Sequence, residues 1–209
     1  MTTTIDAYIS ELRETVVAAG LNYDVWWALR GPDTAPKYQK EMQRHNLFFS
    51  TSARANLVAA LVALYRIYEG RRDSYNIPGL IKLLRGRFSE KELRDIEALN
   101  SQAKPIWVKV CILRNKVFGH RAKSHTIEEA FSEAGVTPND IVRLLDITRK
   151  FLNKVSLAHD KTTHAFNLEA QGDTVRLLKE LGGAMTKRSN PAVHTDLARK
   201  TAQGRCPTR

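Results

Sequence analysis

The sequence has few of the residues that build disulfide-linked or turn-rich folds. Its 209 residues include two cysteines, Cys111 and Cys206, which are too few for a disulfide framework or a cysteine-based metal site. Glycine and proline are also scarce, with 11 and 7 residues, so the frequent turns of an all-β chain are missing. The composition therefore favours one helical domain with a single core and some additions.

Signals for export and for membrane insertion are missing as well. The first six residues do not combine a charged segment with a following apolar segment, as a signal peptide does. No apolar run approaches the about 18 residues that a membrane-spanning helix needs. We therefore expect a cytoplasmic protein without a membrane partner.

The common catalytic signatures are also absent. The chain has no glycine-rich phosphate loop, no Cys-x-x-Cys pair, no His-Glu-x-x-His and no serine elbow. His159 and His164 are five residues apart, so they do not share one face of a helix as paired metal ligands would. Neither a metal site nor a cofactor is predicted.

Acidic residues are outnumbered by basic ones. The chain has 33 Lys and Arg against 22 Asp and Glu, which gives a net charge of +11. Such an excess fits a partner rich in phosphate, because Lys and Arg displace counterions from nucleic acid; a solvated basic surface is the alternative interpretation. Residues 182–209 carry six basic residues and one acidic residue, so more than half of the net charge lies elsewhere in the chain.

What the sequence does contain is helical periodicity. Apolar residues recur every three or four positions, no segment alternates strictly, and no repeat of fixed period is found. The predicted helices cover residues 5–19, 24–30, about 38 or 45 to 69, 79–84, 89–104, 106–118 and 173–181, and two more begin at Thr126 and Thr137. The first is predicted to stop at Gly20 and the last before Gly182 and Gly183. A loop is predicted from the end of the second helix to residue 40. Within residues 53–68 the apolar stripe is wide enough for burial on two sides, in a bundle or at a dimer contact.

Capping and breaking residues set several of these boundaries. Ser89, Thr126 and Thr137 begin segments with the form of a helix N-terminus. Pro105 is predicted to interrupt the helix that begins at Ser89, and Gly119 to stop the helix that follows. We predict a helical domain over residues 1–182 and a basic, disordered tail over residues 183–209.

The candidate site is the sequence RNKVFGH at residues 114–120, where an apolar helix ends. Cleavage of RNA without a metal needs a base for the 2′-hydroxyl, an acid for the 5′-oxygen and positive charge at the phosphate. The His120 imidazole suits the proton transfer, and the Arg114 guanidinium suits bidentate phosphate binding. Asn115 either orients the imidazole or holds a phosphate oxygen. A plain helix end, whose basic residues complement the helix dipole, is the structural alternative.

A second copy of the spacing weakens the bare pattern. Arg188 and His194 repeat it in the tail, with Pro191 between them and no periodic scaffold to hold the groups in place. We therefore place the site at the first copy, which a strongly apolar helix presents.

These residues resemble the signature of the HEPN superfamily, which has Arg, then a polar residue, then a spacer that ends in His. The wider context, in residues 48–69, 76–84 and 114–120, is most similar to the abortive-infection AbiU-like branch. The resemblance covers roughly residues 5–181. It implies an antiparallel helical bundle with extra short helices that dimerises, so that two motif copies face a shared cleft.

The resemblance also implies an activity. It implies a metal-independent endoribonuclease that leaves a 2′,3′-cyclic phosphate, in a toxin–antitoxin or phage-defence system. By position, Arg114 would hold the scissile phosphate, His120 would transfer protons and Asn115 would support both as the third catalytic residue. A dimer also follows physically, because two copies supply both an acid and a base.

Three basic residues outside the motif are assigned to the RNA backbone on charge alone: Lys116, Arg121 and Lys123. Two other functions stay open. One is an RNA-binding or regulatory HEPN module that does not cleave and is controlled by a partner antitoxin, such as a small nucleotidyltransferase-like protein. The other is a helical DNA-binding regulator, although no helix-turn-helix with a recognition helix is found.

Overall fold

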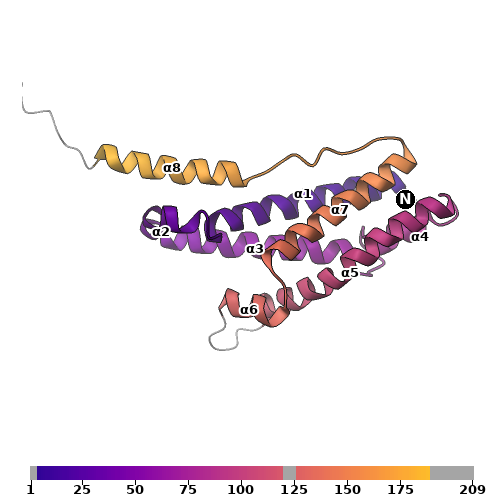
Figure 1. The fold of residues 1–209 in the computed structure, drawn as a ribbon, viewed down its shortest axis with the longest axis horizontal. Coiled ribbons are helices and arrows are strands. Elements are labelled where there is room, and N and C mark those ends of the chain that lie inside the picture. The colour runs from indigo at the N-terminus through magenta and orange to yellow at the C-terminus, as the bar shows by residue number, and fades with distance from the viewer. Residues whose placement is uncertain (1–3, 120–125, 189–209) are drawn as a thin grey trace, which may run out of the picture.

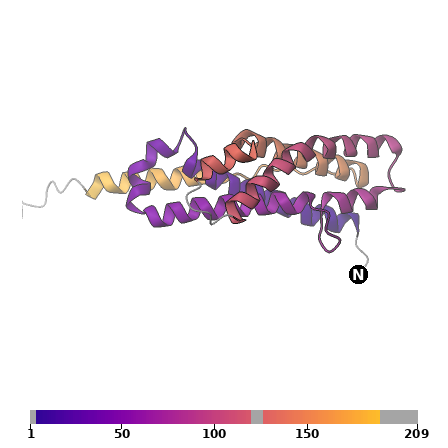
Figure 2. The same ribbon diagram turned by 90° about the horizontal axis from the view of Figure 1, so that it is seen from below.

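The computed structural model describes residues 4–119 and 126–188, and within these residues every regular element is helical. Four long helices form the body (Figure 1): α1 (Ile5–Arg30), α3 (Asn46–Tyr68), α5 (Glu90–Gly119) and α7 (Pro138–His159). The chain reverses direction from each of these helices to the next, and the views in Figures 1 and 2 agree on this. The predicted all-α, antiparallel bundle is confirmed.

The wide apolar stripe of α3 is explained by two packing partners. α3 packs most extensively on α1 and also on α5, while α5 packs in turn on α7. Leu57, Leu61 and Leu64 are fully buried in this core. Val58 and Val62, which widen the stripe beside these leucines, are half-buried. The stripe therefore serves the core of the bundle, and part of it reaches the surface.

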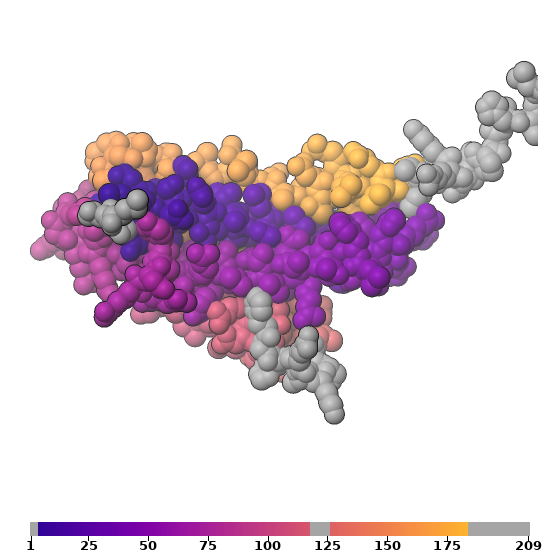
Figure 3. Space-filling model, turned by 180° about the vertical axis from the view of Figure 1, so that it is seen from behind, coloured from indigo at the N-terminus to yellow at the C-terminus, as the bar shows by residue number. Residues whose placement is uncertain are grey.

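Shorter elements extend the bundle. They are η1 (Ala35–Tyr38), α2 (Gln39–Arg44), α4 (Ile77–Leu84), α6 (Ile127–Ala134) and α8 (Gln171–Arg188). α8 returns along the outside of α1 and also contacts η1 and α2, with Leu178 fully buried in that contact. Figure 3 shows α8, in yellow, covering part of the indigo and violet helices.

Local capping signals in the sequence are confirmed. The Oγ1 atom of Thr126 accepts from the backbone N–H of Glu129 at 3.2 Å, and the Glu129 carboxylate accepts from the Thr126 N–H at 2.7 Å. Thr137 and Asp140 form the same reciprocal pair at the start of α7. Each pair satisfies N–H groups that the first turn of a helix leaves without a partner.

Two predicted helix breaks are wrong. α1 continues through Gly20 because this residue lies buried against α7, where an added Cβ would be 2.9 Å from the Arg149 Nη2 atom. Gly20 therefore leaves room for the end of the Arg149 side chain and does not end the helix. α5 likewise continues through Pro105, which is exposed, while Ala103 and Ile106 on either side of it are buried. Packing of that inner face holds the helix together across the missing N–H.

Three other boundaries differ from the prediction. The segment expected to be a loop up to residue 40 contains η1 and the first residues of α2. α3 begins at Asn46, so the later of its two expected starts is confirmed. α8 does not end at Gly182 and Gly183 but continues to Arg188. The tail predicted to be disordered spans residues 183–209, and its residues 183–188 belong to α8. Residues 189–209 lie outside the described residues, and the domain division at residue 182 stays a prediction.

One helix corrects the expectation that no apolar run is long enough to span a membrane. Of the described helices, α3 is long and apolar enough on length and composition alone, with a mean hydropathy of 1.5 over an 18-residue window that is 33% buried. The core helix of a soluble protein meets the same criterion. In this fold, one face of α3 supplies the bundle core.

Candidate functional site

The inner face of α5 sets the direction in which the candidate motif points. Ile106, Val110 and Leu113 are buried at positions one and two turns apart, so they fix the rotation of the helix against α3 and α7. Arg114 follows directly and is half-buried at the edge of this contact, while Asn115 is exposed. The motif thus begins at a rigid part of the bundle.

Arg114 is held by two kinds of contact. Its Nε and Nη2 atoms both donate to the Oδ1 atom of Asn115, at 3.2 and 2.7 Å. Its Cζ atom lies 3.7 Å from the centre of the Tyr65 ring, which is van der Waals contact with the ring face. A guanidinium has five N–H donors, and those not bonded to Asn115 have no partner among the described residues. These donors are the groups through which a guanidinium binds an anion.

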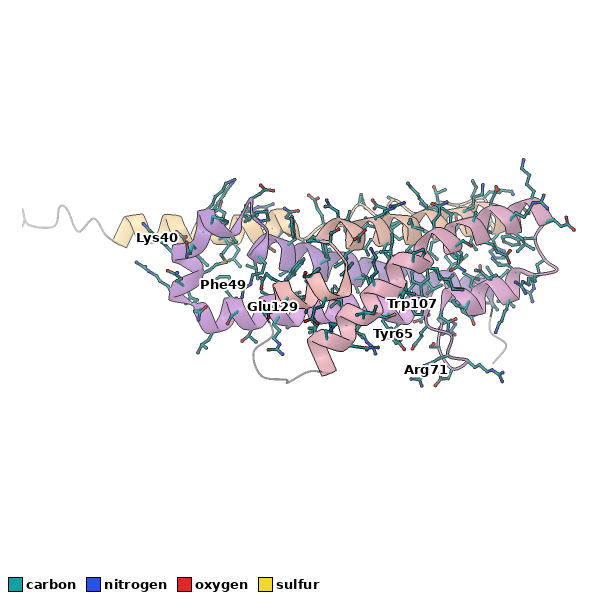
Figure 4. The ribbon with its side chains drawn as sticks, turned by 60° about the horizontal axis from the view of Figure 1, so that its bottom comes forward. Lys40, Phe49, Tyr65, Arg71, Trp107 and Glu129 are labelled. Carbon is teal, nitrogen blue, oxygen red and sulfur yellow. The ribbon has the colours of Figure 1, made fainter. Side chains whose placement is uncertain are left out.

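The Tyr65 ring belongs to a small aromatic group where α3 and α5 meet. Tyr65 stacks on Trp107 with 6.3 Å between ring centres and a 25° angle, and Tyr68 lies 6.4 Å from the same indole. Figure 4 shows Tyr65 and Trp107 next to each other on these two helices. The buried Tyr68 hydroxyl forms a 2.8 Å hydrogen bond with the Oγ1 atom of Thr148 on α7. The aromatic group that contacts Arg114 therefore has packing or hydrogen-bond partners on α3, α5 and α7.

Lys116 joins the end of α5 to α6. Its Nζ atom forms an ion pair with the Oε2 atom of Glu133, and both side chains are partly exposed. Since the ammonium is shared with a carboxylate, its charge is less available to RNA than the sequence predicts. The sequence offers no signal for this pair, because Glu133 belongs to a different helix.

The remaining predicted site residues lie outside the described residues. These are His120, Arg121 and Lys123. The convergence of Arg114 and His120 on one phosphate therefore stays a prediction. Asn115 accepts two hydrogen bonds from the Arg114 guanidinium. Its observed contact is therefore with Arg114.

Other reactive groups are placed apart from the motif or are deactivated. Burial raises the pKa of the Cys111 thiol to about 11, against the smaller opposing effect of Arg114, so it is a neutral, half-buried side chain. His159 pairs with Asp6 across α7 and α1, at 3.0 Å. His164 hydrogen-bonds Ser156. Within the part of the chain that the structure describes, no group of three or more His, Cys, Asp or Glu could hold a metal ion.

Comparison with known families finds a match that covers most of the chain. Residues 2–177 match the AbiU2 family of HEPN domains. The chain belongs to the AbiU2 HEPN family. The predicted family is therefore confirmed, over a range close to the one that the motif and its context indicated. No curated protein and no solved structure shows significant similarity to this AbiU2 protein.

Sequence reasoning missed the aromatic support of the candidate motif. Tyr65 lies within the apolar stripe of residues 53–68, and Trp107 lies within the helix predicted over residues 106–118. The available signal was their chemistry, since aromatic faces bind guanidinium groups. The pairing of Tyr65 with Arg114 depends on how α3 and α5 pack, which spacing along the chain does not encode.

Proposed function

We propose that this AbiU2-family protein is a metal-independent endoribonuclease that cleaves RNA by transesterification. The observation that carries the proposal is the state of Arg114. Its guanidinium contacts Asn115 and Tyr65 near the end of a core helix, and its other N–H donors, which bond none of the described residues, would bind a phosphate. Preorganised positive charge of this kind stabilises a transition state without a cost of reorganisation during the reaction.

In the proposed reaction, the 2′-oxygen of a ribose attacks the adjacent phosphorus, and the bond to the 5′-oxygen breaks. A base takes the proton from the 2′-hydroxyl, and an acid gives a proton to the leaving 5′-oxygen, so the products are a 2′,3′-cyclic phosphate and a 5′-hydroxyl. Arg114 binds the charged oxygens of the pentacoordinate phosphorus. His120 carries the protons, since an imidazole can both accept and donate a proton near neutral pH.

A second copy of the chain would supply the second proton carrier. Val108 and Ile112, one turn apart on α5 just before Arg114, are 48% and 41% exposed. Val58 and Val62 on the neighbouring helix α3 are half-buried. Exposed apolar side chains thus form a surface directly before the motif on α5. Pairing of two such surfaces would bury them and bring two motifs together.

The activity test compares two matched pairs of variants on total RNA. Arg114→Ala and His120→Ala should abolish cleavage, and EDTA should not change the rate of the unmodified protein. Arg188→Ala and His194→Ala are the controls, because they remove the same residue types at the same spacing in the tail. They should cleave at the unmodified rate. Equal cleavage in all four variants would contradict the proposed site.

The dimer test uses surface charges. Val108→Asp combined with Ile112→Asp should yield a monomer in light scattering and lose cleavage. Leu157→Asp on α7 is the control, since Leu157 is also 49% exposed but does not border the motif. An active double variant that is monomeric would refute the composite site. RNA binding without cleavage in the unmodified protein would instead favour a regulatory module that a partner antitoxin controls.

A further inference from the structure

Arg114 depends for its orientation on a residue of another helix. Arg114 and Asn115 are consecutive on α5, so their Cβ atoms point about 100° apart around the helix axis. Neighbours in this relation do not normally face each other. The Arg114 side chain must therefore bend along the helix surface for both Nε and Nη2 to reach Asn115 Oδ1, at 3.2 and 2.7 Å.

The ring of Tyr65 provides the surface against which this bend is made. The Arg114 Cζ atom lies 3.7 Å from the centre of the ring, so the flat guanidinium covers the aromatic face. One face of the cation is thus occupied, and its Nε and Nη2 atoms already donate to Asn115. The Nη1 and Nη2 atoms form the other edge, which is the one that a bidentate contact to phosphate would use.

The ring is itself held in place. Trp107, two turns before Arg114 on the same helix, stacks on Tyr65. Tyr68, one turn after Tyr65 on α3, contacts the same indole and bonds Thr148 on α7. The Tyr65 ring therefore has little freedom to move away from the guanidinium.

We propose that Tyr65 is the positioning residue for Arg114, and that its ring face sets the direction in which the guanidinium presents its N–H groups to an RNA phosphate. The role in cleavage rests on the proposed function, whereas the orientation of Arg114 by Tyr65 does not. Tyr65 does not touch the reacting atoms in this scheme. It acts through Arg114.

The first experiment measures the Arg114 side chain directly by NMR, in the absence of RNA. The aromatic ring should shift the Arg114 Nε–Hε resonance upfield, and the contact should give it a high heteronuclear NOE. Tyr65→Phe should preserve both features, because it keeps the ring face. Tyr65→Leu should abolish the shift and lower the NOE. Tyr75→Leu is the control, since the ring partner of Tyr75 is Tyr8. An unchanged Arg114 resonance in Tyr65→Leu would overturn the proposal.

The second experiment separates binding from reaction. Single-turnover cleavage of an RNA oligonucleotide should slow about fivefold in Tyr65→Leu, the factor expected from loss of a partly exposed cation–π contact. Affinity for the same oligonucleotide with 2′-O-methyl groups should change less than about twofold, because the position of Arg114 matters more for the transition state than for the bound substrate. Tyr65→Phe should restore the rate. A purely structural role would lower the yield of folded protein without this split.

The two proposals fail in different ways. If the unmodified protein cleaves RNA through Arg114 and Tyr65→Leu keeps the full rate, the positioning role is refuted and the nuclease stands. If the unmodified protein does not cleave RNA, the nuclease proposal fails. The NMR comparison then still decides whether Tyr65 orients Arg114.

Discussion

The hydrogen bond between Tyr68 and Thr148 joins α3 to α7 next to the aromatic group that supports Arg114, and its contribution to stability can be tested. Both side chains are buried, and the Thr148 hydroxyl also donates to the Leu144 carbonyl at 2.7 Å. Since a hydroxyl has a single hydrogen, Tyr68 must be the donor in the 2.8 Å bond to Thr148. Burial raises the pKa of the Tyr68 hydroxyl above its usual value, so the hydroxyl keeps its proton at neutral pH.

This assignment predicts unequal effects from the two single substitutions. Tyr68→Phe removes the donor and should lower the free energy of unfolding by about 1 kcal/mol, the net value of a typical hydrogen bond. Thr148→Val should cost more, about 2 kcal/mol, because it leaves a buried hydroxyl donor without an acceptor. The double variant should therefore be more stable than Thr148→Val alone, since it removes that unpaired donor.

Urea denaturation followed by circular dichroism measures these differences as a double-mutant cycle. For the double variant to be more stable than Thr148→Val, the coupling between the two sites must exceed the cost of Tyr68→Phe, so it should be about 1.5 kcal/mol. Tyr75→Phe is the matched control, because Tyr75 is 40% exposed, and it should change stability by less than about 0.5 kcal/mol. Additive effects, or a double variant less stable than Thr148→Val, would show that the donor assignment is wrong.

Two further predictions concern the cap of α4 and a histidine between α7 and α8. Asn76→Ala should cost about 1–2 kcal/mol in urea denaturation, because Asn76 accepts from the Gly79 N–H at 2.8 Å and donates to the Arg71 carbonyl at 2.7 Å; a loss below about 0.5 kcal/mol, as at an exposed site, would argue against the capping bond. For His164, burial and the charge of Arg13 lower the pKa below its usual value, so its contribution to stability is present above about pH 6.5 and lost as the pH falls through the lowered pKa. Tm should therefore fall less between about pH 7.5 and 5.5 in His164→Gln than in the unmodified protein, and parallel curves would disprove this.

The fold could be predicted to the extent that it depends on local interactions. The caps at Thr126 and Thr137 were correct because each is made between residues three positions apart. Helical periodicity identified the long helices for the same reason. Gly20 and Pro105 were misjudged because their effect depends on packing. A glycine between two close helices and a proline on an exposed face both remain inside a helix.

The candidate site shows the same division. Composition, the RNKVFGH sequence and its apolar helix were enough to indicate the HEPN family, because the motif is contiguous and its residues are recognisable one by one. The contacts of Arg114 with Tyr65, and of Lys116 with Glu133, were not predictable. Each joins two helices, and its geometry follows from their rotation and approach.

The sequence by itself thus determined that the chain is helical and where most of its helices begin. These properties depend on periodicity and on bonds within a single turn. Only the tertiary structure decided what holds the motif: a ring from α3, an indole two turns earlier on α5, and a carboxylate from α6. The reason is physical, since side chains far apart in the sequence meet only after burial of the apolar faces has fixed how the helices pack.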